Sequence, residues 1–231
     1  MSDIQAVVLD LDGALLGSDK SISPRNYEAV KRCYDSGIHI IVATARPPRA
    51  ANQLEISHQI NHFIKLHAAQ SIINYEVNDS CYTCTPISDS ELRHFGIRSS
   101  DPKPLVVDKD FLSSLSPTKI LVHGYSAWID IIEQFGDHVN VIATDGGVLV
   151  QIMHKSASKE DAVQWVLNEI GVRAENIMVF GDDFNDLGLF HNCGFPIAME
   201  NAIMELKNCA KHITESNDND GVAVALEKLV L

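Results

Sequence analysis

The sequence lacks an uninterrupted apolar run long enough to cross a membrane, which takes about 20 residues. Positive charge is also sparse, because 18 Lys and Arg stand against 31 Asp and Glu, giving a formal net charge of −13. Nucleic acids and anionic membrane surfaces attract concentrated Lys and Arg, so neither is expected as a partner. An anionic substrate would have to be attracted by local positive charge.

Cysteine is too infrequent and too scattered to indicate a disulfide framework, so a reducing compartment is expected. The five cysteines are Cys33, Cys81, Cys84, Cys193 and Cys209. No signal peptide precedes the first apolar segment, which predicts a cytoplasmic protein. The length of 231 residues leaves room for one core and a smaller second domain.

Two carboxylates follow the first apolar segment of the chain. Asp10 and Asp12 come directly after residues 6–9, which are predicted to form a buried strand. Residues i and i+2 of an extended segment point the same way, and Gly13 then permits a sharp turn. Two like charges this close favour a bound cation, and Mg²⁺ prefers oxygen ligands. Taken alone, the Asp-x-Asp-Gly pattern fits an ordinary turn equally well.

Polar residues follow other apolar segments as well. Thr44 comes after residues 39–43, and an acidic segment, 181–186, comes after residues 176–180. Lys159 stands just before a helical pattern. Ligands of open α/β sheets bind outside the carboxyl ends of the strands, so these residues are expected to share one site.

Taken in order, these segments resemble the four motifs of the haloacid dehalogenase-like hydrolases. The motifs are Asp10-Leu11-Asp12-Gly13, Thr44, Lys159 and Gly181-Asp182-Asp183-Phe184-Asn185-Asp186. Residues 197–202 and 220–223 further resemble the Cof-type subgroup, which comprises phosphatases with a cap inserted between the second and third motifs. Together the matching segments cover nearly the whole chain.

The alternation of strand and helix at both ends of the chain agrees with this resemblance, because it indicates a parallel sheet. The segment between has a different pattern, with strands around a helix and a hairpin signal at Asp145-Gly146-Gly147. We therefore predict an α/β fold with a Rossmann-like parallel-sheet core, residues 1–79 and 154–231. A small α+β cap, residues 80–153, is expected as an insert that moves as a lid.

The resemblance implies a role for each motif residue. Asp10 would be the nucleophile that forms an aspartyl-phosphate, and Asp12 the general acid and then the general base. Thr44 would donate a hydrogen bond to the phosphoryl group, and Lys159 would neutralise its charge. Asn185 would orient Lys159 or touch the substrate.

The cofactor implied by the resemblance is Mg²⁺. Its ligands would be Asp10, the backbone carbonyl of Asp12 and Asp182, with Asp186 supporting the metal or its waters. The neighbouring Asp183 is expected to face solvent or to cap a helix.

The expected activity is a Mg²⁺-dependent phosphatase acting on small phosphorylated metabolites such as sugar phosphates. Two departures from the family pattern leave alternatives open. Ala14 stands where the first motif usually has Thr, and His67-Ala68-Ala69-Gln70 stands where the subgroup usually has Asn-Gly-Ala. A catalytically weakened regulatory protein that binds a phosphorylated metabolite is one alternative, and a phosphotransferase or mutase is the other. The sequence leaves the oligomeric state open.

Two further patterns resemble metal sites. Cys81 and Cys84 have the spacing of half a zinc site, but no second pair follows them, so structural cysteines are expected. Residues 216–221 nearly copy a calcium loop, but Ser216 takes the first ligand position and a short strand precedes it. A polar loop before the last helix is therefore expected there.

Overall fold

The computed structural model describes residues 4–44, 72–77, 80–94, 103–144 and 147–231. The chain divides into two compact units, which are residues 1–45 with 158–231 and residues 46–157. No helix in the described part of the chain is long and apolar enough to span a membrane.

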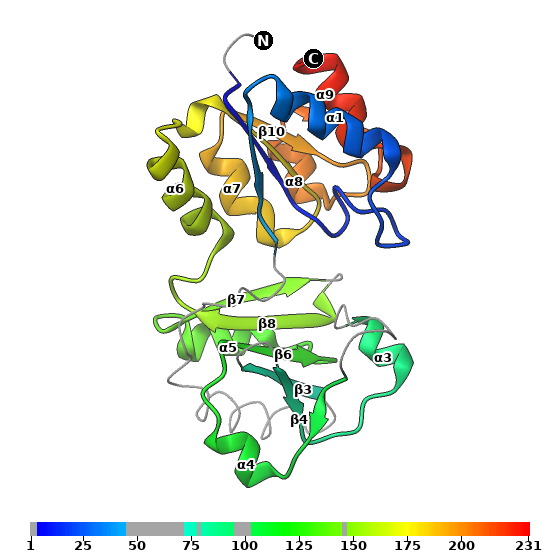
Figure 1. Ribbon diagram of the computed structural model, residues 1–231. Coiled ribbons are helices and arrows are strands. Elements are labelled where there is room, and N and C mark those ends of the chain that lie inside the picture. The colour runs from blue at the N-terminus through cyan, green and yellow to red at the C-terminus, as the bar shows by residue number, and fades with distance from the viewer. Residues whose placement is uncertain (1–3, 45–71, 78–79, 95–102, 145–146) are drawn as a thin grey trace. The chain divides into compact units, whose positions relative to one another are not determined.

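The first unit is built on a five-stranded sheet in which every paired strand is parallel (Figure 1). Its strand order is β11-β10-β9-β1-β2. The strands are β1 (Ala6–Leu9), β2 (His39–Val42), β9 (Ile177–Gly181), β10 (Phe195–Ala198) and β11 (His212–Ile213). Leu9 lies opposite both Val42 and Phe180, so β1, β2 and β9 end together at one edge of the sheet. This arrangement confirms the predicted α/β fold class.

Helices cover both faces of this sheet. The helices α1 (Pro24–Asp35) and α9 (Gly221–Leu229) pack against each other on one side (Figure 1). On the other side α6 (Lys159–Ile170) and α8 (Met204–Cys209) both contact α7 (Leu187–Asn192). Three single-turn 3₁₀ helices complete the unit, and they are η2 (Ala174–Asn176), η3 (Phe184–Asp186) and η4 (Asn217–Asn219).

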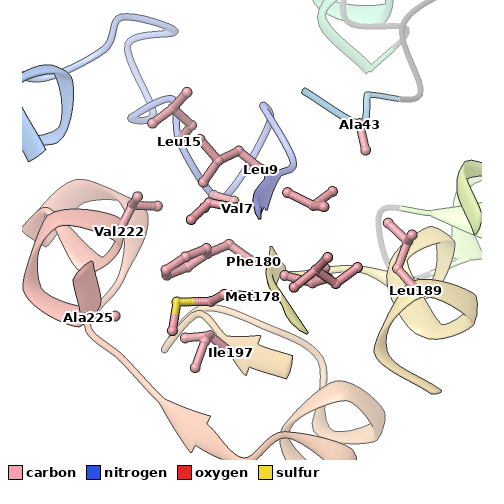
Figure 2. Close-up of a cluster of buried hydrophobic side chains, with 14 of the residues drawn as sticks. Val7, Leu9, Leu15, Ala43, Met178, Phe180, Leu189, Ile197, Val222 and Ala225 are labelled. Carbon is pink, nitrogen blue, oxygen red and sulfur yellow. The ribbon is translucent and has the colours of Figure 1, made fainter. Parts of the chain in front are cut away.

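The central strands are buried on both faces, which explains their continuous apolar sequence. Figure 2 shows Val7 and Leu9 beside Met178 and Phe180, all four without exposed surface. The helices pack onto this centre through residues that include Val222 of α9. A rigid apolar sheet therefore supports the polar residues that follow its strands.

The second unit is a six-stranded, mainly antiparallel sheet in the order β5-β4-β3-β6-β8-β7. The strands are β3 (Ile72–Val77), β4 (Ser80–Thr83), β5 (Leu105–Val106), β6 (Lys119–His123), β7 (Val139–Thr144) and β8 (Leu149–His154). The helices in the described residues of this unit are α3 (Asp89–His94), α4 (Lys109–Ser114) and α5 (Trp128–Phe135). Leu112 of α4 and Ile131 of α5 are buried in the same cluster as Tyr75, Ile120 and Ile152 of the sheet. The unit has the α+β composition that we predicted for the insert.

The strand pairing moves the first boundary of the insert. We expected residues up to 79 in the core, but β3 pairs antiparallel with β6, and Tyr75 lies opposite Ile120. The side chain of Tyr75 is fully buried in the second unit. Alternating apolar residues indicate a strand, but they do not indicate which sheet it joins, because pairing is a long-range contact.

The other boundary also moves slightly, since the division between the units falls after Ala157 and not after Met153. The strands β7 and β8 form the predicted antiparallel hairpin, although its turn residues Asp145 and Gly146 lie outside the described residues. The segment His67-Ala68-Ala69-Gln70 also lies outside them. Cys81 and Cys84 form no disulfide bond in the described part of the chain.

Candidate active site

The first acidic residue of the chain lies buried at the end of β1. The backbone N–H of Asp10 donates to the carbonyl of Phe180, at 3.2 Å, which ties Asp10 to the end of β9. Only 5% of the residue is exposed. Asp12 lies outside this buried region, because its side chain is 41% exposed and pairs with Lys20 at 2.8 Å.

Gly13 allows the first acidic loop to approach the second. Its φ of +85° lies in the left-handed region that favours glycine. A Cβ at this position would lie 1.9 Å from Oδ2 of Asp182, which is a severe overlap. The glycine is therefore required both by the turn and by the close contact with the Asp182 carboxylate.

Three carboxylates gather at this edge of the sheet. One oxygen each of Asp10, Asp182 and Asp186 lies within 4.8 Å of the others. Across the described ranges, this is the one group of three or more His, Cys, Asp or Glu side chains that could hold a metal ion. Asp186 is fully buried, and its Oδ2 accepts from the N–H groups of Asp182, at 3.1 Å, and Asp183, at 3.4 Å. Asp186 thus also fixes the turn that carries Asp182.

Lys159 provides positive charge inside this group. It is the first residue of α6, whose N-cap Ser158 accepts a hydrogen bond from the N–H of Asp161 at 3.1 Å. Its Nζ donates to Oδ1 of Asp10 at 2.6 Å and to Oδ1 of Asp186 at 2.7 Å. The Lys159 side chain is only 7% exposed, so these pairs are largely shielded from water.

The ionisation of these groups is strongly perturbed. Burial, and then the neighbouring Asp186, raise the pKa of Asp10 to about 7 even though Lys159 lowers it. Burial raises the pKa of Asp182 to about 8, and Asp10 and Asp186 add to the effect. Burial lowers the pKa of Lys159, but the carboxylates of Asp186 and Asp10 outweigh it, so that pKa is raised. The single positive charge of Lys159 therefore does not fully compensate the three carboxylates.

These residues fit a hard divalent cation. The three candidate ligands are all carboxylates, the donor type that Mg²⁺ prefers. A cation there would compensate both the burial and the mutual repulsion that raise the pKa values of Asp10 and Asp182. In the same turn, Oδ1 of Asn185 is buried without a hydrogen-bond partner, which leaves one more oxygen able to accept from a ligand.

The other predicted site residues lie at or near the same edge. Thr44 follows Ala43, whose N–H donates to the carbonyl of Leu9 at 2.9 Å, so Thr44 comes directly after the paired end of β2. Asn185 belongs to η3, and the hydrogen bonds of Lys159 go to the two carboxylates. The expectation that Asp183 caps a helix is confirmed, because its side chain accepts from the N–H of Phe184 at 2.8 Å and caps η3.

Sequence reasoning missed two residues that contact the first acidic loop. Lys20, which pairs with Asp12, adopts a φ of +63°, and no local pattern marked it. Asn201 donates from Nδ2 to the carbonyl of Gly13 at 2.8 Å. The sequence does contain a signal for Asn201, because this residue lies in the segment 197–202 that resembles the Cof-type subgroup.

Comparisons with known proteins agree with this geometry. A family model described as haloacid dehalogenase-like hydrolase matches residues 7–95 and 55–226. A protein of Haemophilus influenzae named "Putative phosphatase" is 29% identical, over 97% of each chain. A Bacillus subtilis protein named as a 5-amino-6-(5-phospho-D-ribitylamino)uracil phosphatase is 26% identical over 98% of each chain.

Solved structures show the same fold. The crystal structure of a protein of Streptococcus mutans UA159 superposes with a TM-score of 0.83 and 20% identity, covering 97% of this chain and 98% of that one. The family model spans most of the chain, including the segments that hold Asp10, Lys159 and Asp182. The chain therefore belongs to the haloacid dehalogenase-like hydrolases, in the Cof-type subgroup that its sequence resembles.

Proposed function

We propose that this protein is a Mg²⁺-dependent phosphatase that hydrolyses small phosphorylated metabolites through an aspartyl-phosphate. The observation that carries this proposal is the buried group of Asp10, Asp182 and Asp186 around Lys159. The names of the full-length relatives support the phosphatase class. Such a buried group contributes little as a structural device, because burying charge is costly unless it is compensated.

In the first step a carboxylate oxygen of Asp10 attacks phosphorus, and the bond from phosphorus to the leaving alkoxide breaks. Lys159 keeps the Asp10 side chain oriented through its 2.6 Å hydrogen bond. The leaving oxygen takes a proton from Asp12, whose partly exposed side chain is accessible from solvent. The carboxylates of Asp10, Asp182 and Asp186 would hold Mg²⁺, which would polarise the phosphoryl group and offset its repulsion from them.

In the second step water attacks the phosphorus of the aspartyl-phosphate. Asp12 takes a proton from that water, and the bond between phosphorus and the Asp10 oxygen breaks, which restores the Asp10 carboxylate. Thr44 and Lys159 would hold the phosphoryl oxygens during both displacements. Asn185 would orient the substrate or Lys159 from the neighbouring turn.

Sugar phosphates and related phosphorylated polyols are the proposed substrates. The Bacillus subtilis relative is named for a phosphorylated ribityl compound, which belongs to this chemical class. The second unit is the proposed cap, which would close over the substrate and exclude water. In this proposal the first unit carries out the chemistry and the second unit selects the substrate.

The test is a panel of phosphorylated metabolites assayed for phosphate release with and without Mg²⁺. It should include hexose and pentose phosphates and the phosphorylated ribityl compound. Asp10→Asn is expected to abolish release, because an amide oxygen is a poor nucleophile. Asp35→Asn, at an exposed aspartate of the same unit, is the matched control and should retain full activity.

The outcomes separate the candidate functions. Substantial release by the D10N variant would refute the covalent mechanism. Binding of a panel member without any turnover would indicate a regulatory protein. Transfer of phosphate to an added sugar acceptor, in preference to water, would indicate a phosphotransferase.

A further inference from the structure

The loop that carries the proposed nucleophile is held by hydrogen bonds from a distant part of the chain. This loop, residues 10–23, connects β1 to α1 and is called the nucleophile loop below. Its Leu16 carbonyl accepts from Nδ2 of Asn217 at 3.0 Å. The backbone N–H of Ser18 donates to Oδ1 of Asp218 at 2.7 Å. The residues that resembled a calcium loop thus bind the nucleophile loop directly.

Asn201 occupies the junction of these contacts. Its Nδ2 donates to the carbonyl of Gly13 at 2.8 Å, and its Oδ1 accepts from the N–H of Asn217 at 3.0 Å. Both ends of the amide are therefore used, which fixes the direction in which Nδ2 points. The Asn201 side chain therefore joins Gly13 of the nucleophile loop to residues 217–218, which form the hydrogen bonds to Leu16 and Ser18.

The turn around Asn201 also binds the second acidic loop. The N–H of Met199 donates to the carbonyl of Gly181 at 3.2 Å, and the N–H of Ile203 donates to the carbonyl of Asp182 at 2.9 Å. Residues 199–203 therefore contact both loops that supply the carboxylates. Asn201 provides the side-chain contact between this turn and Gly13.

The position of Gly13 relative to Asp182 is critical because the two are in close contact. A Cβ on Gly13 would overlap the Asp182 carboxylate, so little space separates the loops there. A glycine backbone is also more easily displaced than that of other residues. Ala14, which follows it, is fully buried among apolar residues and offers no hydroxyl to hold the loop.

We propose that Asn201 is a positioning residue for the reaction, holding the Asp10–Gly13 segment in register with Asp182. This inference rests on the proposed phosphatase function. Asn201 touches no reacting atom and acts through the Gly13 backbone. Because Asn201 is exposed, its hydrogen bonds contribute modestly to global stability, and the main consequence of losing them is misplacement of the nucleophile.

The test is the variant Asn201→Asp. A carboxylate at this position still accepts from the N–H of Asn217 but cannot donate to the carbonyl of Gly13. Asn192→Asp is the matched control, because Asn192 is also exposed and donates from Nδ2 to a backbone carbonyl, that of Gly188, at the same 2.8 Å. Both variants are made in the full chain.

The expected result is a kcat that falls about 10-fold or more in N201D while KM changes by less than about two-fold, since orientation affects the chemical step. N192D should keep the wild-type kcat. Hydrogen–deuterium exchange of the metal-free protein provides a second measurement. Peptides covering residues 10–23 should exchange faster in N201D alone, with the thermal midpoint close to that of N192D.

Unchanged kcat and unchanged exchange in N201D would overturn the proposal. A fall in kcat that appears equally in N192D, or that follows a general loss of stability, would also overturn it. If wild-type protein releases phosphate from no member of the panel, the proposed function fails, and exchange alone decides on the positioning contact. Faster exchange confined to residues 10–23 supports the contact, and wild-type exchange there overturns it.

Discussion

Replacing Lys159 by Met tests whether this lysine compensates the buried carboxylates. The side chain is 7% exposed and bonds two carboxylates at 2.6 and 2.7 Å. Methionine has a similar length but no charge, so Asp10 and Asp186 would lose their shared partner. Removing one partner of a buried ion pair costs about 3–5 kcal/mol, because the remaining charge is left uncompensated.

An exposed lysine of the same unit provides the comparison. Lys31 pairs with Asp35 at 2.5 Å, but the two side chains are 49% and 54% exposed. Lys31→Met should therefore lower the free energy of unfolding much less than Lys159→Met does, because water and salt screen an exposed pair. The two substitutions remove lysine–aspartate pairs of similar length, and burial is the main difference between them.

Urea unfolding of metal-free protein, followed by circular dichroism, measures both losses. The loss in K159M should be larger at pH 8 than at pH 5, because at the lower pH the folded protein can protonate Asp10 and avoid an uncompensated charge. Equal losses in K159M and K31M at pH 8 would refute the inference that Lys159 acts as a buried counter-ion. A loss in K159M that is independent of pH would refute the electrostatic cause.

The metal assignment predicts that Asp182→Ala strongly weakens Mg²⁺ binding in calorimetry whereas Asp183→Ala does not; comparable losses in both would show that the cluster is misassigned. Gly13→Ala should lower Mg²⁺ affinity and turnover by displacing the Asp182 carboxylate. Gly37→Ala is the control, because an alanine there meets the same unfavourable φ, +87°, but nothing lies within 4 Å of its Cβ. Its effect should therefore be that of backbone strain alone, without the loss of Mg²⁺ affinity. Folding raises the pKa values of Asp10 and Asp182 from 3.8 to about 7 and about 8. The stability of the metal-free protein should therefore fall as pH rises from about 4 to 8. For the same reason, the rise in thermal midpoint on adding Mg²⁺ should be greater at pH 8 than at pH 5. A larger rise at pH 5 would contradict this linkage.

Much of the first unit was predictable because its local signals agree with its tertiary contacts. The helix α1 begins where Ser23 caps it and Pro24 occupies its first turn, and both residues are typical of helix starts. The strand β1 is apolar on both faces because helices cover both faces of the parallel sheet. The acidic residues that follow such strands were expected at one edge, and the parallel pairing accounts for their convergence.

The features that could not be predicted depend on contacts between distant residues. The membership of β3 in the second sheet depends on pairing with β6, more than 40 residues away. The contact between Asn201 and Gly13 spans 188 positions, and no local pattern specifies it. Asp186 was expected to support the metal, but its hydrogen bonds to Lys159 and to the Asp182 N–H emerged only from the folded turn.

Charge balance links these observations to substrate binding. When all three carboxylates are ionised, they and Lys159 carry a formal charge of −2, which one Mg²⁺ would neutralise. The chain as a whole carries −13, so its general field opposes an anionic phosphate ester. The Lys159 ammonium already donates to Asp10 and Asp186, which leaves one of its three N–H groups for a phosphoryl oxygen and no positive charge in excess of the carboxylates. Where the carboxylates are ionised, cation binding should therefore precede phosphate binding, because the metal-loaded cluster no longer repels the dianion.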